Sequence, residues 1–262
     1  MEAAKQAPPS EPLWLDAAVQ RITIDRPVIV LGKGPGLARV PRSISRTHHV
    51  VGINQSLAAV EHAHAVFALD VHHMCHVMFD PALRDRWDHF FVPDGICRRW
   101  DSLKVELPVG LNDFRPLDVH RRPGWMYERM RYEDVDRIID FGRFGDRIVR
   151  YRVWDTALTE NPVDPETFQR WAEGADLLKN HTNSAHMAFH YLRRQGVTEV
   201  LTAGMGDQVG YADLGFDIEF IDDQGYVSGR WSRTCEVLEA LGIRHRRLED
   251  MGVDELAALS PA

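Results

Sequence analysis

Asp70, His72, His73 and His76 stand close together in the chain, directly after a short apolar run. A carboxylate or an imidazole can take the proton of an attacking hydroxyl, so we predict Asp70 and His72 as catalytic residues that face an acceptor. His72 and His76 are four residues apart, a spacing that puts both on one helical face and is compatible with metal ligation. The alternative is that these histidines begin a helix and that one of them only lines the site. We predict no metal site.

A glycine-rich run, Gly32-Lys33-Gly34-Pro35-Gly36, follows the apolar run 28–31. A turn of this kind between a strand and a helix can bring backbone amides close to a phosphate. The run fits neither common version of such a loop. The loop of nucleoside triphosphatases has Ser or Thr after its lysine, where Gly34 stands, and the dinucleotide fingerprint has a glycine where Leu37 stands. A tight turn without a ligand is therefore the alternative.

Polar residues also follow the next strands. Asn54 and Gln55 end the second predicted strand, and Asp70 ends the third. Because the carboxyl ends of parallel strands border one ligand site, we expect these side chains to face the glycine run. Amide side chains both donate and accept hydrogen bonds, which suits ribose hydroxyls, a base edge or a phosphate.

A later helix start adds a second group of predicted contacts. His181 and Thr182 precede a helical pattern, and helix N-termini attract phosphate. Farther along this helix, His186 and His190 lie among apolar residues, and we interpret them as packing histidines. The predicted nucleotide- and phosphate-binding residues are Gly32, Lys33, Gly34, Pro35, Gly36, Asn54, Gln55, His181, Thr182, Asn183, Ser184, Gly204 and Asp207. For Asp207, a simple turn aspartate is the alternative.

The apolar runs around these residues predict the elements that position them. The predicted strands are 28–31, 50–54, 65–69, 89–92, 200–203 and 243–248. The predicted helices are 37–43, 56–63, 71–79, 183–195 and 231–241. Strands that alternate with helices at this spacing form right-handed crossovers and a parallel sheet. We therefore predict an α/β, Rossmann-like fold, with a mostly parallel sheet and helices on both of its faces.

The domain organisation follows from length and periodicity. A chain of 262 residues is within reach of one domain, and we predict a single domain over 1–262. We expect residues 1–20 to form an N-terminal tail or extension. The stretch from about 96 to 164 is rich in Arg, Asp, Trp and Pro and has poor periodicity, so we interpret it as an inserted, lid-like region.

Two blocks of the sequence resemble a known group of proteins. Gly32-Lys33-Gly34-Pro35-Gly36-Leu37 with the later Asn54-Gln55 resembles the Gly-x-Gly-Pro-Ser-Leu … Asn pattern of bacterial sialyltransferases. The related flagellin-glycosylation proteins and hydroxymethylpterin diphosphokinase-like proteins share this pattern. Thr182-Asn183-Ser184, followed by Gly204, is similar to their second block. The resemblance implies that both blocks hold the cytidine monophosphate part of a sugar donor.

The resemblance also implies an activity, with departures. It implies a glycosyltransferase-like enzyme that uses a nucleotide-activated sugar as donor, and a CMP-linked acid sugar is the favoured donor. The acceptor would be a hydroxyl group of a glycan or a protein. The chain has Gly36 where the pattern has Ser, and 229–232 lacks the histidine that serves as the family's general base. Two alternatives stay open. One is a diphosphokinase for a pterin-like alcohol, the only reading that needs Mg²⁺; the other is a nucleotide- or sugar-binding protein without turnover.

Composition excludes some classes of function. The formal net charge is -8, which disfavours nucleic acid as a partner. No apolar run reaches the roughly 18 residues of a membrane span, so we expect no stable membrane insertion. The three cysteines are scattered, which favours reduced thiols and a cytoplasmic protein.

Overall fold

The computed structural model describes residues 13–68, 71–93, 141–155, 177–180, 184–206, 212–214 and 230–259. Its centre is a parallel sheet built from the short apolar runs. Every residue of β2 (Val28–Leu31) and β3 (His49–Ile53) is buried, as expected for strands that are covered on both faces. The other strands are β1 (Leu13–Trp14), β4 (Ala63–Phe67), β5 (Trp87–Pro93), β6 (Ile148–Asp155), β7 (Leu177–Asn180), β8 (Glu199–Ala203) and β9 (Arg244–Arg247).

The strand order reverses in the middle of the sheet. The order is β1-β6-β5-β4-β3-β2-β8-β9, with β7 paired to β6, and every pairing among the described strands is parallel. From β2 the chain builds outward through β3, β4, β5 and β6, and it then returns to place β8 on the other side of β2. The carboxyl ends of β2 and β8 therefore form a topological switch point, where open α/β sheets bind ligands. The predicted α/β, mostly parallel, Rossmann-like fold is confirmed.

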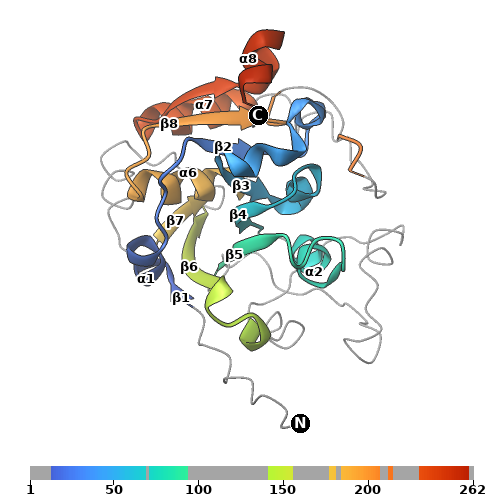
Figure 1. Ribbon diagram of the computed structural model, residues 1–262. Coiled ribbons are helices and arrows are strands. Elements are labelled where there is room, and N and C mark those ends of the chain that lie inside the picture. The colour runs from blue at the N-terminus through green and yellow to red at the C-terminus, as the bar shows by residue number, and fades with distance from the viewer. Residues whose placement is uncertain are drawn as a thin grey trace, which may run out of the picture.

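Two hydrophobic clusters cover the two faces of the sheet, and Figure 1 shows helices on both sides of it. One face carries α2 (Val71–Phe79) and the 3-10 helices η1 (Pro35–Arg39), η2 (Arg42–Arg46) and η3 (Asn54–Ala59). The other face carries α1 (Leu15–Arg21), α6 (Ser184–Arg194) and α7 (Arg230–Ala240). The remaining helices are η5 (Phe141–Arg147), η7 (Leu248–Asp250) and α8 (Val253–Ala258).

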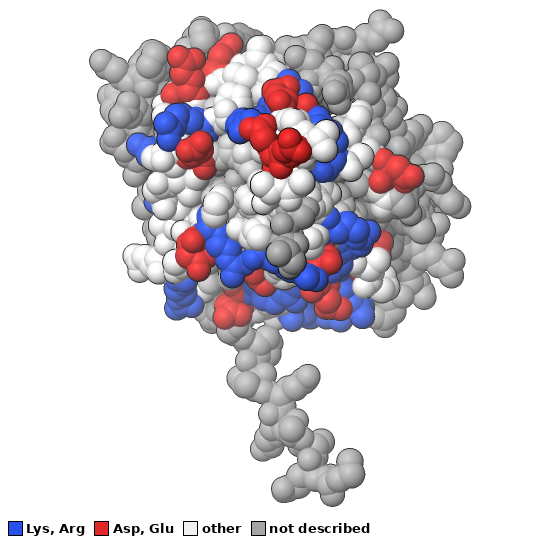
Figure 2. All heavy atoms as spheres, turned by 45° about the horizontal axis from the view of Figure 1, so that its top comes forward, with Lys and Arg blue, Asp and Glu red and all other residues white. Residues whose placement is uncertain are grey.

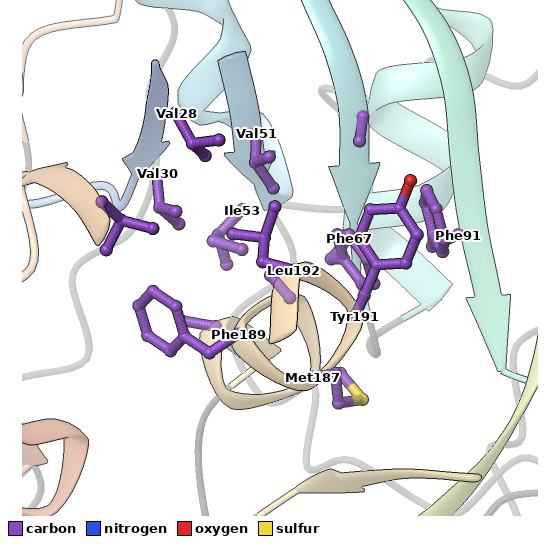
Figure 3. Close-up of a cluster of buried hydrophobic side chains, with 14 of the residues drawn as sticks. Val28, Val30, Val51, Ile53, Phe67, Phe91, Met187, Phe189, Tyr191 and Leu192 are labelled. Carbon is purple, nitrogen blue, oxygen red and sulfur yellow. The ribbon is translucent and has the colours of Figure 1, made fainter. Parts of the chain in front are cut away.

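Helix α6 supplies much of the second cluster (Figure 3). Its Met187, Phe189, Tyr191 and Leu192 are buried, and Tyr191 and Leu192 point at the strands. The strand side chains that meet them are Val28, Val30, Val51, Ile53, Phe67 and Phe91. The Phe67 and Phe91 rings stack with centroids 4.1 Å apart. This packing fixes the neighbouring strands β2, β3, β4 and β5, and the carboxyl ends of β2 and β3 carry part of the candidate site.

Two predicted α-helices are short 3-10 helices instead. In place of a helix at 37–43 the chain forms η1 and η2, because Pro41 has no N–H and restricts the residue before it, which ends one helix and allows another to begin. In place of a helix at 56–63 it forms η3, which ends before β4 begins at Ala63.

The predicted insertion and tail are interrupted by regular structure. Residues 141–155, which fall inside the expected insertion at 96–164, form η5 and β6. β6 pairs with β5 on one side and β1 on the other, so it belongs to the sheet. Within the expected tail at 1–20, β1 and most of α1 pack on that edge of the sheet. The sequence pattern did not reveal β6, because its eight residues alternate irregularly between apolar and charged types.

Charged residues of both signs are interspersed on the face that carries the C-terminal elements (Figure 2). Arg246 pairs with Glu255, and Arg247 lies near Asp250. None of the helices in the described ranges has the length and apolar character needed to cross a bilayer.

Candidate functional site

The glycine run lies at the switch point and is bonded to the turn after β8. The Gly32 amide donates to the Ala203 carbonyl and the Gly34 amide donates to the Gly204 carbonyl, both at 2.8 Å. A Cβ on Gly32 would lie 2.3 Å from the Gly204 carbonyl oxygen, so only glycine allows this approach. Gly204 itself has a φ of 66°, in the left-handed region that favours glycine. These glycines therefore join two loops across the switch point.

This contact changes the role expected of the loop amides. Two of the amides that we expected to bind phosphate, those of Gly32 and Gly34, are already engaged in backbone hydrogen bonds. Pro35, the first residue of η1, has no N–H to offer. The Gly32 and Gly34 amides are therefore not available to a phosphate at this loop, and Lys33 is the cation that the loop provides.

A carboxylate that the sequence analysis missed lies against the same loop. Glu249, in η7, accepts a 2.8 Å hydrogen bond from the Gly204 amide through Oε1. The same oxygen lies 1.9 Å from where a Cβ of Gly36 would stand. Its Oε2 makes no hydrogen bond to the described part of the chain, and it lies 4.0 Å from Nε of Arg247. No local sequence pattern predicts this contact, because Glu249 lies more than 200 residues after Gly36 in the sequence.

The contact explains why the chain has Gly36 where the resembling pattern has Ser. We expect Gly36→Ser to lower the free energy of unfolding by about 2 kcal/mol, because Glu249 must swing away and leave the Gly204 amide without its acceptor. In a Glu249→Ala background the same change should cost less than about 0.5 kcal/mol. Urea unfolding of the four proteins of this cycle measures the coupling. Equal losses in the two backgrounds would show that the carboxylate is not the obstacle.

Asn54 stands at the carboxyl end of β3 with a strained backbone. Its φ is 55°, the only positive value among the non-glycine residues described. Asparagine tolerates this region better than most residues, and such strain gathers at functional sites. The side chain is 8% exposed, and its Oδ1 makes no hydrogen bond within the described structure. The Asn54 side-chain oxygen therefore accepts no hydrogen bond from the described residues, and it lies at the position where we predicted a nucleotide contact.

Lys33, Gln55 and His73 form a hydrogen-bonded network beside Asn54. The His73 ring lies in the first turns of α2, with Nε2 3.3 Å from Lys33 Nζ and Nδ1 2.6 Å from Gln55 Nε2. Gln55 is fully buried and His73 is 7% exposed. Ser56, in η3, donates a 2.8 Å hydrogen bond to the Leu31 carbonyl and so links η3 to the end of β2. The structure thus brings together two predicted binding residues and a histidine that the sequence analysis grouped with Asp70 and His72 but did not select.

The other predicted residues fall into two groups. Asp70, His181, Thr182, Asn183 and Asp207 lie outside the described residues, as does the side chain of His72. Ser184 is buried at the first position of α6, a helix that contacts β3 and β4.

The two pairs of histidines spaced four apart have different surroundings. His76 Nε2 lies 3.1 Å from Asp80 Oδ2. The pKa of His76 is lowered, mainly because the ring is buried. His186 and His190 are buried, as expected of packing residues, and His186 Nε2 lies 3.1 Å from Thr234 Oγ1 on α7. The described residues contain no group of three His, Cys, Asp or Glu side chains arranged to hold a metal ion.

Comparisons with known proteins add one likeness. No protein-family model matches the chain, and no curated protein matches it. Among solved structures, the chain is similar to the crystal structure of the sialyltransferase CST-II in complex with a trisaccharide acceptor and CMP. The TM-score is 0.42 at 13% identity, and the match covers 85% of this chain and 81% of the other.

Proposed function

We propose that this chain binds a nucleotide-activated sugar at the carboxyl ends of β2, β3 and β8 and transfers the sugar to an acceptor hydroxyl. The observation that carries the proposal is the network of Lys33, Gln55 and His73 beside the strained Asn54. It combines a cation for phosphate, amides for hydroxyl groups or a base edge, and an imidazole that can move a proton. All of these groups lie on one side of the switch point, where parallel sheets bind nucleotides.

The charges around the loop favour a donor with a single phosphate. Lys33 is the cation of the glycine run, whereas the Glu249 carboxylate lies against Gly36 and Gly204. A second phosphate on the Gly36 side would face this negative charge. The Glu249 side chain is only 7% exposed, so solvent and salt screen its charge weakly. A nucleoside monophosphate sugar, with CMP as the favoured nucleotide, fits this arrangement better than a diphosphate sugar.

The first test is a thermal-shift panel of CMP, CDP, UDP, GDP, ADP and ATP, each with and without Mg²⁺. A ligand at 100 times its dissociation constant stabilises the folded protein by about 2.7 kcal/mol. We expect CMP to raise the melting temperature without Mg²⁺ and more than the diphosphates do. In Lys33→Met the dissociation constant should rise about 100-fold, since a charge-assisted bond to phosphate is lost. Arg84→Ala is the matched control, because Arg84 is exposed and pairs only locally with Asp85.

Other outcomes would contradict the proposal. A shift that requires Mg²⁺ and ATP would indicate phosphoryl transfer, and no shift with any nucleotide would leave the glycine run as a structural junction. Slow hydrolysis of a CMP-linked acid sugar in the absence of acceptor, measured as released CMP, separates an enzyme from a protein that only binds the nucleotide.

A further inference from the structure

The two nitrogens of the His73 ring both face nitrogen atoms. Nε2 lies 3.3 Å from the Lys33 ammonium and Nδ1 lies 2.6 Å from Gln55 Nε2. An ammonium and an amide NH₂ are both donors, while a neutral imidazole has one acceptor nitrogen and one donor nitrogen. With the Gln55 amide in this orientation, one of the two contacts therefore sets a donor against a donor.

Rotating the Gln55 amide removes the conflict. A half-turn about the last side-chain bond exchanges the amide oxygen and nitrogen without moving the rest of the side chain. The 2.6 Å separation also suits an N–H···O bond better than a contact between two nitrogens. In the unrotated form Gln55 Oε1 is buried and makes no hydrogen bond within the described structure. After rotation, this oxygen accepts from His73 Nδ1–H, and Nε2 keeps its lone pair for the Lys33 ammonium.

We propose that Gln55 holds His73 in the Nδ1–H tautomer, and that binding of the donor phosphate to Lys33 releases His73 Nε2 to act as the general base. The proposal rests on the proposed transferase function and supplies a base for a chain that lacks the histidine of the resembling family. Lys33 is the link, because its ammonium bonds to Nε2 in the ligand-free protein and prefers a phosphate oxygen when one is present. His73 is the catalytic residue and Gln55 is the positioning residue.

These groups account for the proton and the leaving group of the transfer step. His73 Nε2 takes the proton of the acceptor hydroxyl while the acceptor oxygen forms a bond to the anomeric carbon. The bond from that carbon to the phosphate oxygen breaks, and its electron pair leaves with the nucleotide phosphate. Lys33 stabilises the negative charge that develops on this phosphate. The proton on His73 is then released to solvent, which restores the base.

Imidazole ¹⁵N NMR tests the tautomer and the release separately, with His73→Asn to assign the signal. In the ligand-free protein we expect His73 with Nδ1 protonated and Nε2 unprotonated, a pattern kept in Gln55→Glu and lost in Gln55→Leu. Adding CMP or inorganic phosphate should move the Nε2 resonance in the wild type but not in Lys33→Met. Protonation at Nε2 in the ligand-free wild type would overturn the role of Gln55. An unmoved Nε2 resonance at saturating CMP would overturn the release.

Kinetics distinguishes failure of this inference from failure of the proposed function. We expect His73→Asn to reduce sugar transfer by at least about 100-fold, the usual contribution of a general base, while the CMP dissociation constant changes less than about threefold. Normal transfer by His73→Asn would overturn the inference and leave the transferase proposal standing. If the wild type binds no nucleotide in the thermal-shift panel, the proposed function itself fails, and the ligand-free tautomer still decides the role of Gln55.

Discussion

Gly32→Ala is expected to lower the free energy of unfolding by about 3 kcal/mol, because it forces two backbones apart at the switch point. The added Cβ would stand 2.3 Å from the Gly204 carbonyl oxygen and 2.8 Å from Met205 Cγ. Met205 can rotate away, but the carbonyl is backbone and moves only with its turn. That movement would also stretch the hydrogen bonds from Gly32 to Ala203 and from Gly34 to Gly204. Urea unfolding measures the loss.

Three further glycines separate close approach from backbone conformation. Gly204→Ala combines a φ of 66° with a Cβ 2.8 Å from the Gly32 carbonyl oxygen, so we expect a loss of about 4 kcal/mol. Gly196 and Gly242 also have positive φ, but a Cβ there meets nothing within 4 Å. Their alanine variants should lose only about 1 to 2 kcal/mol. A Gly32→Ala protein as stable as wild type would show that the two loops are not tightly joined.

Acid should destabilise the protein through a group of histidines at the amino ends of β3, β4 and β5. Burial lowers the pKa of His49 to about 4, and the neighbouring His64 adds to this effect, while Asp88 and Asp25 oppose it. His49 is only 4% exposed and stacks on the His64 ring at 4.6 Å. The Val50 amide donates to His64 Nδ1 at 2.9 Å, so His64 also needs an unprotonated nitrogen.

The direction of this effect follows from proton binding. His49 has a pKa of 6.5 when unfolded and about 4 when folded, so between these values the unfolded chain binds more protons. The stability is therefore complete above pH 6.5 and falls as the pH drops towards 4, with a loss of up to about 3 kcal/mol from His49. Burial also lowers the pKa values of His64 and His89, which act in the same direction.

Urea unfolding at pH 7.5, 6, 5 and 4.5 measures this loss. His49→Phe keeps an aromatic ring against His64 but cannot titrate, so its stability should fall much less over the same range. A wild type equally stable at pH 7.5 and 4.5 would contradict the prediction. So would a His49→Phe protein with the full wild-type slope, which would assign the effect to other groups.

The sequence by itself determined the class of fold and most of its central elements. A strand with a continuous apolar run such as 28–31 has apolar side chains on both faces, and both faces must be buried. These runs therefore predicted parallel strands covered by helices. Helix α2 has the predicted bounds, Val71–Phe79, and the predicted helix at 183–195 corresponds to α6 (Ser184–Arg194). Local periodicity carries this information because each element buries one face against the same sheet. It missed β6, whose eight residues mix charged and apolar side chains without a clear period.

The tertiary structure alone decided how the candidate site is assembled. Glycines in the run at 32–36 predicted an open phosphate loop, but the fold uses the Gly32 and Gly34 amides to bind the turn after β8. Glu249 reaches Gly36 from the other end of the chain, and His73 reaches Lys33 and Gln55 from the next crossover. Sequence spacing does not report such contacts, because they depend on the order of strands in the sheet. The strand order, with β8 inserted beside β2, is what brings these distant residues to one edge.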